Sequence, residues 1–258
     1  MASLPATDRN LAGQRAVVTG SSSGIGRAIV LQLAAAGADV LVHCHESQAE
    51  AESVAELARV HGVRAFVTRA DLRDAGECHE LVTRSWALLG TCDIWVNNAG
   101  ADVLTGPAAR LSFEEKFAEL VAVDLRATLL LGRAVGERMQ AAGSGVILNM
   151  GWDRADIGME GDSGQLFAAV KAAVMAFTKS LALSLAPRIR VNCLAPGWIR
   201  TAWGEQASQS WQQRAQREAP LGRWGTSEDV AQVAHFLCSP AATFITGQVV
   251  RINGGAVR

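Results

Sequence analysis

A glycine-rich turn near the start of the chain has the residue types that bind phosphate. It spans residues 19–26 (TGSSSGIG), between a short apolar run and a segment with helical spacing. Glycines let a backbone approach a pyrophosphate, and the first amides of a helix direct N–H groups at the anion. A plain tight turn is the alternative, because a glycine turn alone is a weak motif. The predicted phosphate-binding residues are Gly20, Ser22, Ser23, Gly24, Ile25 and Gly26.

The elements that must position this turn alternate regularly between strand and helix. Apolar runs predict strands at residues 16–19, 40–43, 65–68, 93–96, 145–149, 190–193 and 249–252. Helical spacing predicts helices at residues 27–36, 49–61, 75–89, 113–139 and 165–186. This alternation indicates βαβ units and a parallel sheet with helices on both faces. We therefore expect one α/β domain over residues 1–258, doubly wound and Rossmann-like, with about seven strands.

The composition excludes several classes of protein. Hydrophobic residues make up 49% of the chain, which excludes disorder, and a net charge of −1 leaves no basic surface for nucleic acid. Five widely spaced cysteines argue against a disulfide framework and favour a reducing, cytoplasmic setting. Residues 1–10 lack the apolar core of a signal peptide, and no apolar run reaches the length of a membrane span. The chain contains no tyrosine.

Further motifs follow the glycine turn in a fixed order and resemble the short-chain dehydrogenase/reductase family. TGxxxGIG at 19–26, ADL at 70–72, NNAG at 97–100 and VNCLAPG at 191–197 resemble the cofactor-binding motifs of that family. Residues 220–223 and 246–255 resemble its C-terminal segments. The resemblance implies dinucleotide contacts from Asp71, Leu72, Asn98, Ala99, Gly100, Lys171, Pro196, Gly197 and Thr201.

The catalytic residues are where the chain departs from this family, whose usual set is asparagine, serine, tyrosine and lysine. Lys171 is in place, but Phe167 stands four residues earlier, where the family has tyrosine. Gly151 or Trp152 occupies the serine position, in a segment about two residues longer than usual, and Asp124 occupies the asparagine position. A proton donor must lie within hydrogen-bond reach of the oxygen it serves, and phenylalanine has no hydroxyl to donate.

Three functions fit this altered set. The first is an oxidoreductase acting on a small carbonyl or alcohol, in which Lys171 polarises the oxygen or a carboxyl in an apolar pocket donates the proton. The second is a pseudoenzyme that binds dinucleotide or ligand without turnover. The third is non-redox dehydration, isomerisation or ring closure, with Asp153 or Asp124 as base. The first is favoured because the cofactor motifs are intact. Its candidate acids are Asp153, Asp156, Glu160, Asp162 and Asp102, although a solvated loop charge is the plainer interpretation of each.

The change from asparagine to Asp124 adds a negative charge close to the lysine. We predict a direct ion pair in which Asp124 orients Lys171 toward the cofactor ribose. The alternative is a surface carboxylate paired with Arg126 or Arg133.

The end of the second predicted strand bears on the choice of cofactor. Cys44 stands where NAD-binding proteins of this fold carry an acidic residue, and His45, Ser47 and Arg27 supply basic or polar groups nearby. This favours NADP(H) over NAD(H). The segment also resembles the HxHRS stretch of pteridine reductases, with Glu46 in place of the arginine. His43 and His45 share one face of a strand while Cys44 points away, so we predict no metal site.

The segment at 198–220 follows the PG turn and is expected to form a lid over a small-molecule substrate. It contains Trp198, Trp203 and Trp211, and Trp152 joins them from the other side. Tryptophans stack well on flat or aromatic ligands, and helix packing is the alternative role.

The helices at 113–139 and 165–186 carry apolar residues beyond one stripe. This predicts a homodimer or homotetramer, with a larger monomeric core as the alternative.

Overall fold

Seven parallel strands form one sheet in the order β3-β2-β1-β4-β5-β6-β7. A computed structural model of the chain describes residues 9–201, 204 and 208–257. The strand order reverses between β1 and β4, and ligands of such folds bind at the carboxyl ends of the strands beside this switch point. The strands are β1 (Arg15–Val18), β2 (Asp39–Cys44), β3 (Ala65–Arg69), β4 (Ile94–Asn97), β5 (Gly145–Met150), β6 (Ile189–Pro196) and β7 (Val249–Ile252). The predicted doubly wound α/β fold is confirmed.

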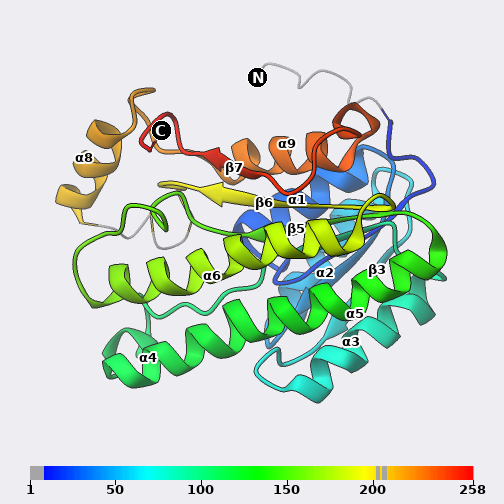
Figure 1. Ribbon diagram of the computed structural model, residues 1–258, viewed down its shortest axis with the longest axis horizontal. Coiled ribbons are helices and arrows are strands. Elements are labelled where there is room, and N and C mark those ends of the chain that lie inside the picture. Colours follow the sequence, from blue (N-terminus) through cyan, green and yellow to red (C-terminus); the bar gives the residue numbers. More distant parts are fainter. Residues whose placement is uncertain (1–8, 202–203, 205–207, 258) are drawn as a thin grey trace.

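Helices cover both faces of the sheet (Figure 1). Neighbouring side chains on a strand point to opposite faces, so Ala16 and Val18 join one core and Val17 joins the other. The first core is completed by α1 (Gly24–Ala35), α2 (Gln48–Arg59) and α9 (Ser227–Cys238). The second is completed by α3 (Ala75–Leu89), α5 (Ala127–Ala142) and α6 (Asp162–Leu185). Helix α8 (Gln209–Glu218) lies at the end of the sheet where β6 ends.

The helix predicted over residues 113–139 is present, but it is not a regular α-helix throughout. The chain forms α4 (Phe113–Leu120), a π-helical turn (Val121–Arg126) and then α5. A π-turn inserts one extra residue, and such turns occur often at functional sites. Asp124 is the buried residue of this turn, and its carboxylate bonds to groups on other elements. Those tertiary contacts are not visible in hydrophobic periodicity, which reports only the face that a helix buries.

Helix α6 is long and apolar enough to cross a membrane by length and composition alone. Its apolar residues have partners within the fold, because α6 packs against β5, β6 and α5. The expected absence of a membrane partner stays a prediction, as does self-association. Several large apolar side chains are exposed in the described part of the chain, among them Leu183, Leu221 and Phe244.

Two leucines of α6 provide a matched test of this packing. The side chain of Leu181 is 8% exposed and belongs to the second core, whereas Leu183, two residues away, is 83% exposed. Leu181→Ala should lower the free energy of unfolding by about 2–5 kcal/mol, because it leaves a cavity. Leu183→Ala should change it by less than about 0.5 kcal/mol. Equal effects in urea denaturation would contradict the placement of α6.

Candidate active site

The glycine turn between β1 and α1 is pressed against the residues that follow β4. Gly20 has a φ of +60°, and a Cβ there would lie 2.8 Å from the Cα of Ala99. A Cβ on Gly26 would lie 2.3 Å from the carbonyl oxygen of Gly20. Only glycine fits these two positions, which is the condition for a backbone that closely approaches a pyrophosphate.

Asn98 fastens this turn to the end of β4. Its side-chain amide donates hydrogen bonds of 2.9 Å to the carbonyl oxygens of Thr19 and Gly20. In return, the Thr19 hydroxyl oxygen accepts from the backbone N–H groups of Asn98 and Ala99, each at 3.0 Å. The amide of Asn98 is therefore occupied in shaping the groove, although the residue also lines it.

His43 forms a hydrogen bond with the glycine turn. Its Nδ1 accepts a 3.0 Å hydrogen bond from the backbone N–H of Gly20, and its Nε2 lies 3.1 Å from the carbonyl oxygen of Ala70. Accepting at Nδ1 requires the neutral ring with its proton on Nε2. Burial is the main cause that lowers the pKa of His43 to about 4. Both ring nitrogens are thus engaged, and His43 connects the phosphate end of the groove to the end of β3.

Charged residues gather at the adenosine end of the groove. The Nε of Arg73 donates to both carboxylate oxygens of Asp71, at 2.9 and 3.1 Å, and this hydrogen bonding lowers the pKa of Asp71. One guanidinium nitrogen of Arg73 lies 3.3 Å from Nε2 of His45. Glu46 is largely exposed, and its carboxylate lies 3.8 Å from His45. The sequence did not identify Arg73, although it stands only two residues after Asp71.

These elements enclose a groove with a volume of about 460 Å³ at the carboxyl ends of β1 and β4. Most residues predicted to bind the dinucleotide line it: Gly20, Ser22, Ser23, Gly24, Ile25, Gly26, His45, Asp71, Leu72, Asn98, Ala99, Gly100 and Thr201. Lys171, Pro196 and Gly197 instead line a second cavity, of about 600 Å³, which shares Ile25 and Thr201 with the groove. The residues present fit a nicotinamide dinucleotide, because the narrow turn admits only backbone beside the phosphates.

A buried ion pair stands beside this junction. The Lys171 Nζ lies 2.7 Å from Oδ1 of Asp124, and the two residues are 7% and 1% exposed. Asp124 also accepts a 2.8 Å hydrogen bond from the N–H of Ala101, while Lys171 donates to the carbonyl oxygen of Met150 at 3.1 Å. Gly100 leaves room for the carboxylate, because a Cβ there would lie 3.0 Å from Oδ1. The ion pair predicted from the sequence is present; its action on a ribose stays a prediction.

Two aromatic rings lie close together here: Phe167, predicted at the tyrosine position, and Trp152, one of the two residues predicted at the serine position. Trp152 and Phe167 pack edge to face, with their ring centroids 6.3 Å apart, and both line the second cavity. Edge-to-face packing is a preferred geometry for aromatic pairs. Neither ring carries a hydroxyl, so this pair contributes bulk and an apolar wall rather than an acid.

Asp153 lies behind the cavity wall. It is 1% exposed, and its Oδ2 accepts a 3.1 Å hydrogen bond from Asn253, while Oδ1 has no hydrogen-bond partner within the described residues. Burial raises the pKa of Asp153. A Cβ on Gly197 would lie 3.0 Å from Oδ2, so the carboxyl group sits under the PG turn. Asp153 is not among the residues that line the cavity.

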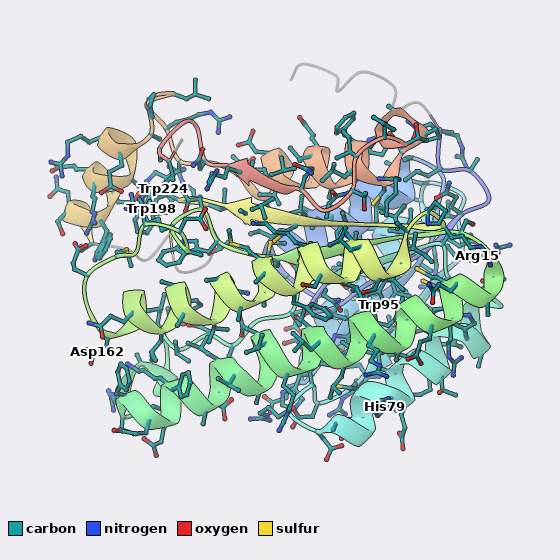
Figure 2. All side chains as sticks on the ribbon, in the orientation of Figure 1. Arg15, His79, Trp95, Asp162, Trp198 and Trp224 are labelled. Carbon is teal, nitrogen blue, oxygen red and sulfur yellow. The ribbon has the colours of Figure 1, made fainter. Side chains whose placement is uncertain are left out.

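The other predicted acids have different surroundings. Asp102 accepts hydrogen bonds from the N–H groups of Leu104 and Thr105, and Asp156 pairs with Arg251. Neither lines the second cavity, whereas Glu160 and Asp162 do. Glu160 is paired with Arg214, and Asp162 begins α6 (Figure 2).

Aromatic rings also form the lid side of the second cavity. The ring centroids of Trp198 and Trp211 lie 5.3 Å apart, and Trp198 packs edge to face on Trp224, as Figure 2 shows beside α8. Trp198 donates a 2.8 Å hydrogen bond to Glu218, which also pairs with Arg154 and Arg214. Trp198 and Trp211 line the cavity; Trp203 lies outside the described residues. Among the described residues, no three histidine, cysteine or acidic side chains are placed to hold a metal ion.

Comparison with known proteins decides the family. Residues 20–257 match a family model described as enoyl-(acyl carrier protein) reductase. The chain is 36% identical over 249 residues to a 3-oxoacyl-[acyl-carrier-protein] reductase, FabG, of Aquifex aeolicus, covering 95% of this chain and 98% of that one. This chain belongs to the short-chain dehydrogenase/reductase family. The FabG protein of Staphylococcus aureus is 34% identical over 242 residues, covering 93% of this chain and 96% of its own.

Solved structures of short-chain dehydrogenases/reductases agree with this assignment. A short-chain dehydrogenase of Burkholderia cenocepacia in complex with NADP has a TM-score of 0.86 at 33% identity, covering 96% of this chain and 99% of its own. A 7α-hydroxysteroid dehydrogenase complexed with NADH and 7-oxo glycochenodeoxycholic acid has a TM-score of 0.88 at 30% identity, with 98% of both chains covered. The family is one of NAD(P)-dependent oxidoreductases.

We predict that Gly20→Val abolishes dinucleotide binding. The Cβ collides with Ala99, and the side chain blocks the approach of the pyrophosphate. Gly62→Val is the matched control, because Gly62 also has positive φ but has nothing within 4 Å of its Cβ. Calorimetric titration with NADPH measures both variants. Unchanged affinity in Gly20→Val would contradict the assignment of the groove.

The lowered pKa of His43 predicts sensitivity to acid. The folded state holds the ring neutral down to about pH 4, while the unfolded state takes up a proton near pH 6.5. The stability that the neutral His43 ring contributes is present above pH 6.5 and is lost as the pH falls. We expect the free energy of unfolding to decrease by about 2 kcal/mol between pH 7 and pH 5. Urea denaturation at both values should show the loss in the unmodified protein and a smaller one in His43→Gln. Equal losses of stability in the two proteins would contradict the conclusion that a neutral His43 ring holds the glycine turn in place.

Proposed function

We propose that this chain is an NADP(H)-dependent oxidoreductase that moves a hydride to or from a flat, largely apolar substrate. The observation that carries the proposal is the junction of the two cavities at Ile25 and Thr201, beside Lys171. A nicotinamide dinucleotide supplies or accepts the hydride when it is bound. The groove offers the phosphate and ribose contacts, and the second cavity offers room for a substrate next to them.

NADP(H) is the proposed cofactor because the adenosine end of the groove carries His45 and Arg73, although Arg73 also pairs with Asp71 and Glu119. His45 and Arg73 line the adenosine end of the groove, and Cys44 leaves the end of β2 without an acid. Glu46 is exposed and does not line the groove. The structure of the Burkholderia cenocepacia relative holds NADP, which supports the same choice.

The substrate class follows from the walls of the second cavity. Four aromatic rings line it, together with the side chains of Met150, Met159 and Leu104. Flat apolar ligands stack on such rings. The FabG relatives are named as 3-oxoacyl reductases, so their names support carbonyl chemistry in general. We transfer reduction by hydride transfer, and neither the acyl substrate nor its carbonyl group.

The lining of the second cavity contains few groups that could donate a proton. The hydrogen bond from Arg214 lowers the pKa of Glu160, and Asp162 is exposed at the start of α6. Ser163 and Thr201 are aliphatic alcohols, which hold their protons more tightly than a phenol. Lys171 remains, as an ammonium group with three N–H donors. The ammonium group donates one of them to the carbonyl oxygen of Met150 and forms an ion pair with Asp124, which leaves at least one for a ribose or a substrate oxygen.

A second candidate function is binding of a dinucleotide or ligand without turnover. The packing of Trp152 on Phe167 favours it, because Phe167 is predicted at the tyrosine position and Trp152 is one of the two residues predicted at the serine position. Hydride transfer to a substrate separates the two functions.

We predict a strongly non-additive response to restoring the two hydroxyl residues. The unmodified protein should oxidise NADPH with a reactive diketone about 10²–10⁴-fold more slowly than an ordinary reductase, because a positioned acid is missing. Phe167→Tyr alone should recover little, since Trp152 still fills the adjacent space. Phe167→Tyr with Trp152→Ser should recover more than the sum of the two single changes on a free-energy scale.

The measurement is steady-state NADPH oxidation by the unmodified protein, the two single variants Phe167→Tyr and Trp152→Ser, and the double variant. Calorimetric NADPH binding is the control for an intact groove. Ordinary reductase turnover by the unmodified protein would show that another acid is present. Substitution of Asp162 or Lys171 would then locate it. A double variant that binds NADPH but stays inert would contradict the assignment of Trp152 to the serine position.

A further inference from the structure

The charges around the second cavity leave one exposed carboxylate, in the first turn of α6, without a cationic side chain as partner among the described side chains. Lys171 is matched by Asp124, and the two arginines of the lid side, Arg154 and Arg214, are matched by Glu218 and Glu160. Asp162 lines the same cavity and forms no ion pair within the described residues. Among the residues that the structure describes, the surroundings of the second cavity therefore combine aromatic rings with a net charge of one negative unit.

Aromatic rings and a carboxylate together favour a cation. The face of an indole or phenyl ring is negative and attracts ammonium-type groups, most strongly in a site from which water is excluded. Trp152 and Phe167 supply such rings, whereas the rings of Trp198 and Trp211 already lie against the guanidinium groups of Arg154 and Arg214. A neutral flat ligand would use the rings but gain nothing from Asp162.

The shortage of proton donors points to the same kind of ligand. Hydride addition to a carbonyl carbon leaves an alkoxide, which needs a proton from a nearby acid. Hydride addition to an iminium carbon breaks the C=N π bond, places that electron pair on nitrogen and yields a neutral amine. The balance is R₂C=N⁺R₂ plus dihydronicotinamide giving R₂CH–NR₂ plus nicotinamide cation, and no proton is consumed.

We propose that the second cavity takes flat cationic C=N compounds, namely iminium ions on an aromatic ring system. This rests on the proposed oxidoreductase function and specifies its substrate. Lys171 is then free to give its third N–H to the cofactor ribose, because no substrate oxygen requires it. Asp162 and the aromatic rings recognise the positive charge that the reaction removes.

A matched pair of bicyclic probes tests the proposal: 2-methyl-3,4-dihydroisoquinolinium, which is permanently cationic, and the neutral ketone 1-tetralone. Binding is read from quenching of tryptophan fluorescence, independently of turnover. Asp162→Asn should weaken iminium binding about two- to fivefold, as expected for a partly exposed charge pair, and leave tetralone binding unchanged. Glu228→Gln is the matched control, because Glu228 lies in the first turn of α9 and does not line the cavity.

Turnover with NADPH separates the possible failures. Saturable iminium reduction with a kcat/KM at least 100-fold above that for tetralone, after subtraction of the uncatalysed rate, is the expected result. Tetralone reduction that equals or exceeds iminium reduction overturns this inference and leaves the oxidoreductase function standing. Equal effects of Asp162→Asn on both probes overturn the assignment of charge recognition to this cavity. NADPH binding without reduction of either probe overturns both proposals.

Discussion

The buried ion pair between Asp124 and Lys171 is the contact on which the arrangement of the site depends. It joins the π-turn between α4 and α5 to helix α6. The bond from Ala101 adds the loop after β4, and the bond to Met150 adds the end of β5. Burying two charges is costly, and each partner of the pair has one further hydrogen bond that offsets part of this cost. Loss of either partner would leave an isolated buried charge, which typically costs about 3–5 kcal/mol.

The two sides of this pair differ in chemistry. Toward the groove, backbone amides, the supporting His43 and the Arg73–Asp71 pair form a polar surface suited to a dinucleotide. Toward the second cavity, Trp152 and Phe167 form an apolar wall without a hydroxyl acid. This chain therefore has the residues for cofactor binding but no hydroxyl acid for proton donation. The proposed substrates are those whose reduction consumes no proton.

Sequence predicted the sheet well, because each buried parallel strand is a short apolar run between turns. Helices α8 and α9, between β6 and β7, were not predicted. Helix α8 buries only Ala215, so it carries little apolar periodicity. The π-turn and the role of His43 depend on hydrogen bonds to distant elements, which periodicity does not encode. The Asp124–Lys171 pair was foreseen because the family motifs fix both positions relative to the sheet. The surroundings of Asp153 could not be predicted, because the segment from 151 to 161 is irregular and carries no periodic signal.

The central claim is that hydride transfer occurs in a site without a hydroxyl acid. The most direct test is a single-turnover reaction with NADPH that carries deuterium at both positions of C4, in which mass spectrometry follows the label into the product. We expect one deuterium on the reduced carbon of the iminium probe and a slower reaction than with unlabelled NADPH. Tight NADPH binding with no deuterium in the product would contradict it and identify the chain as a binding protein.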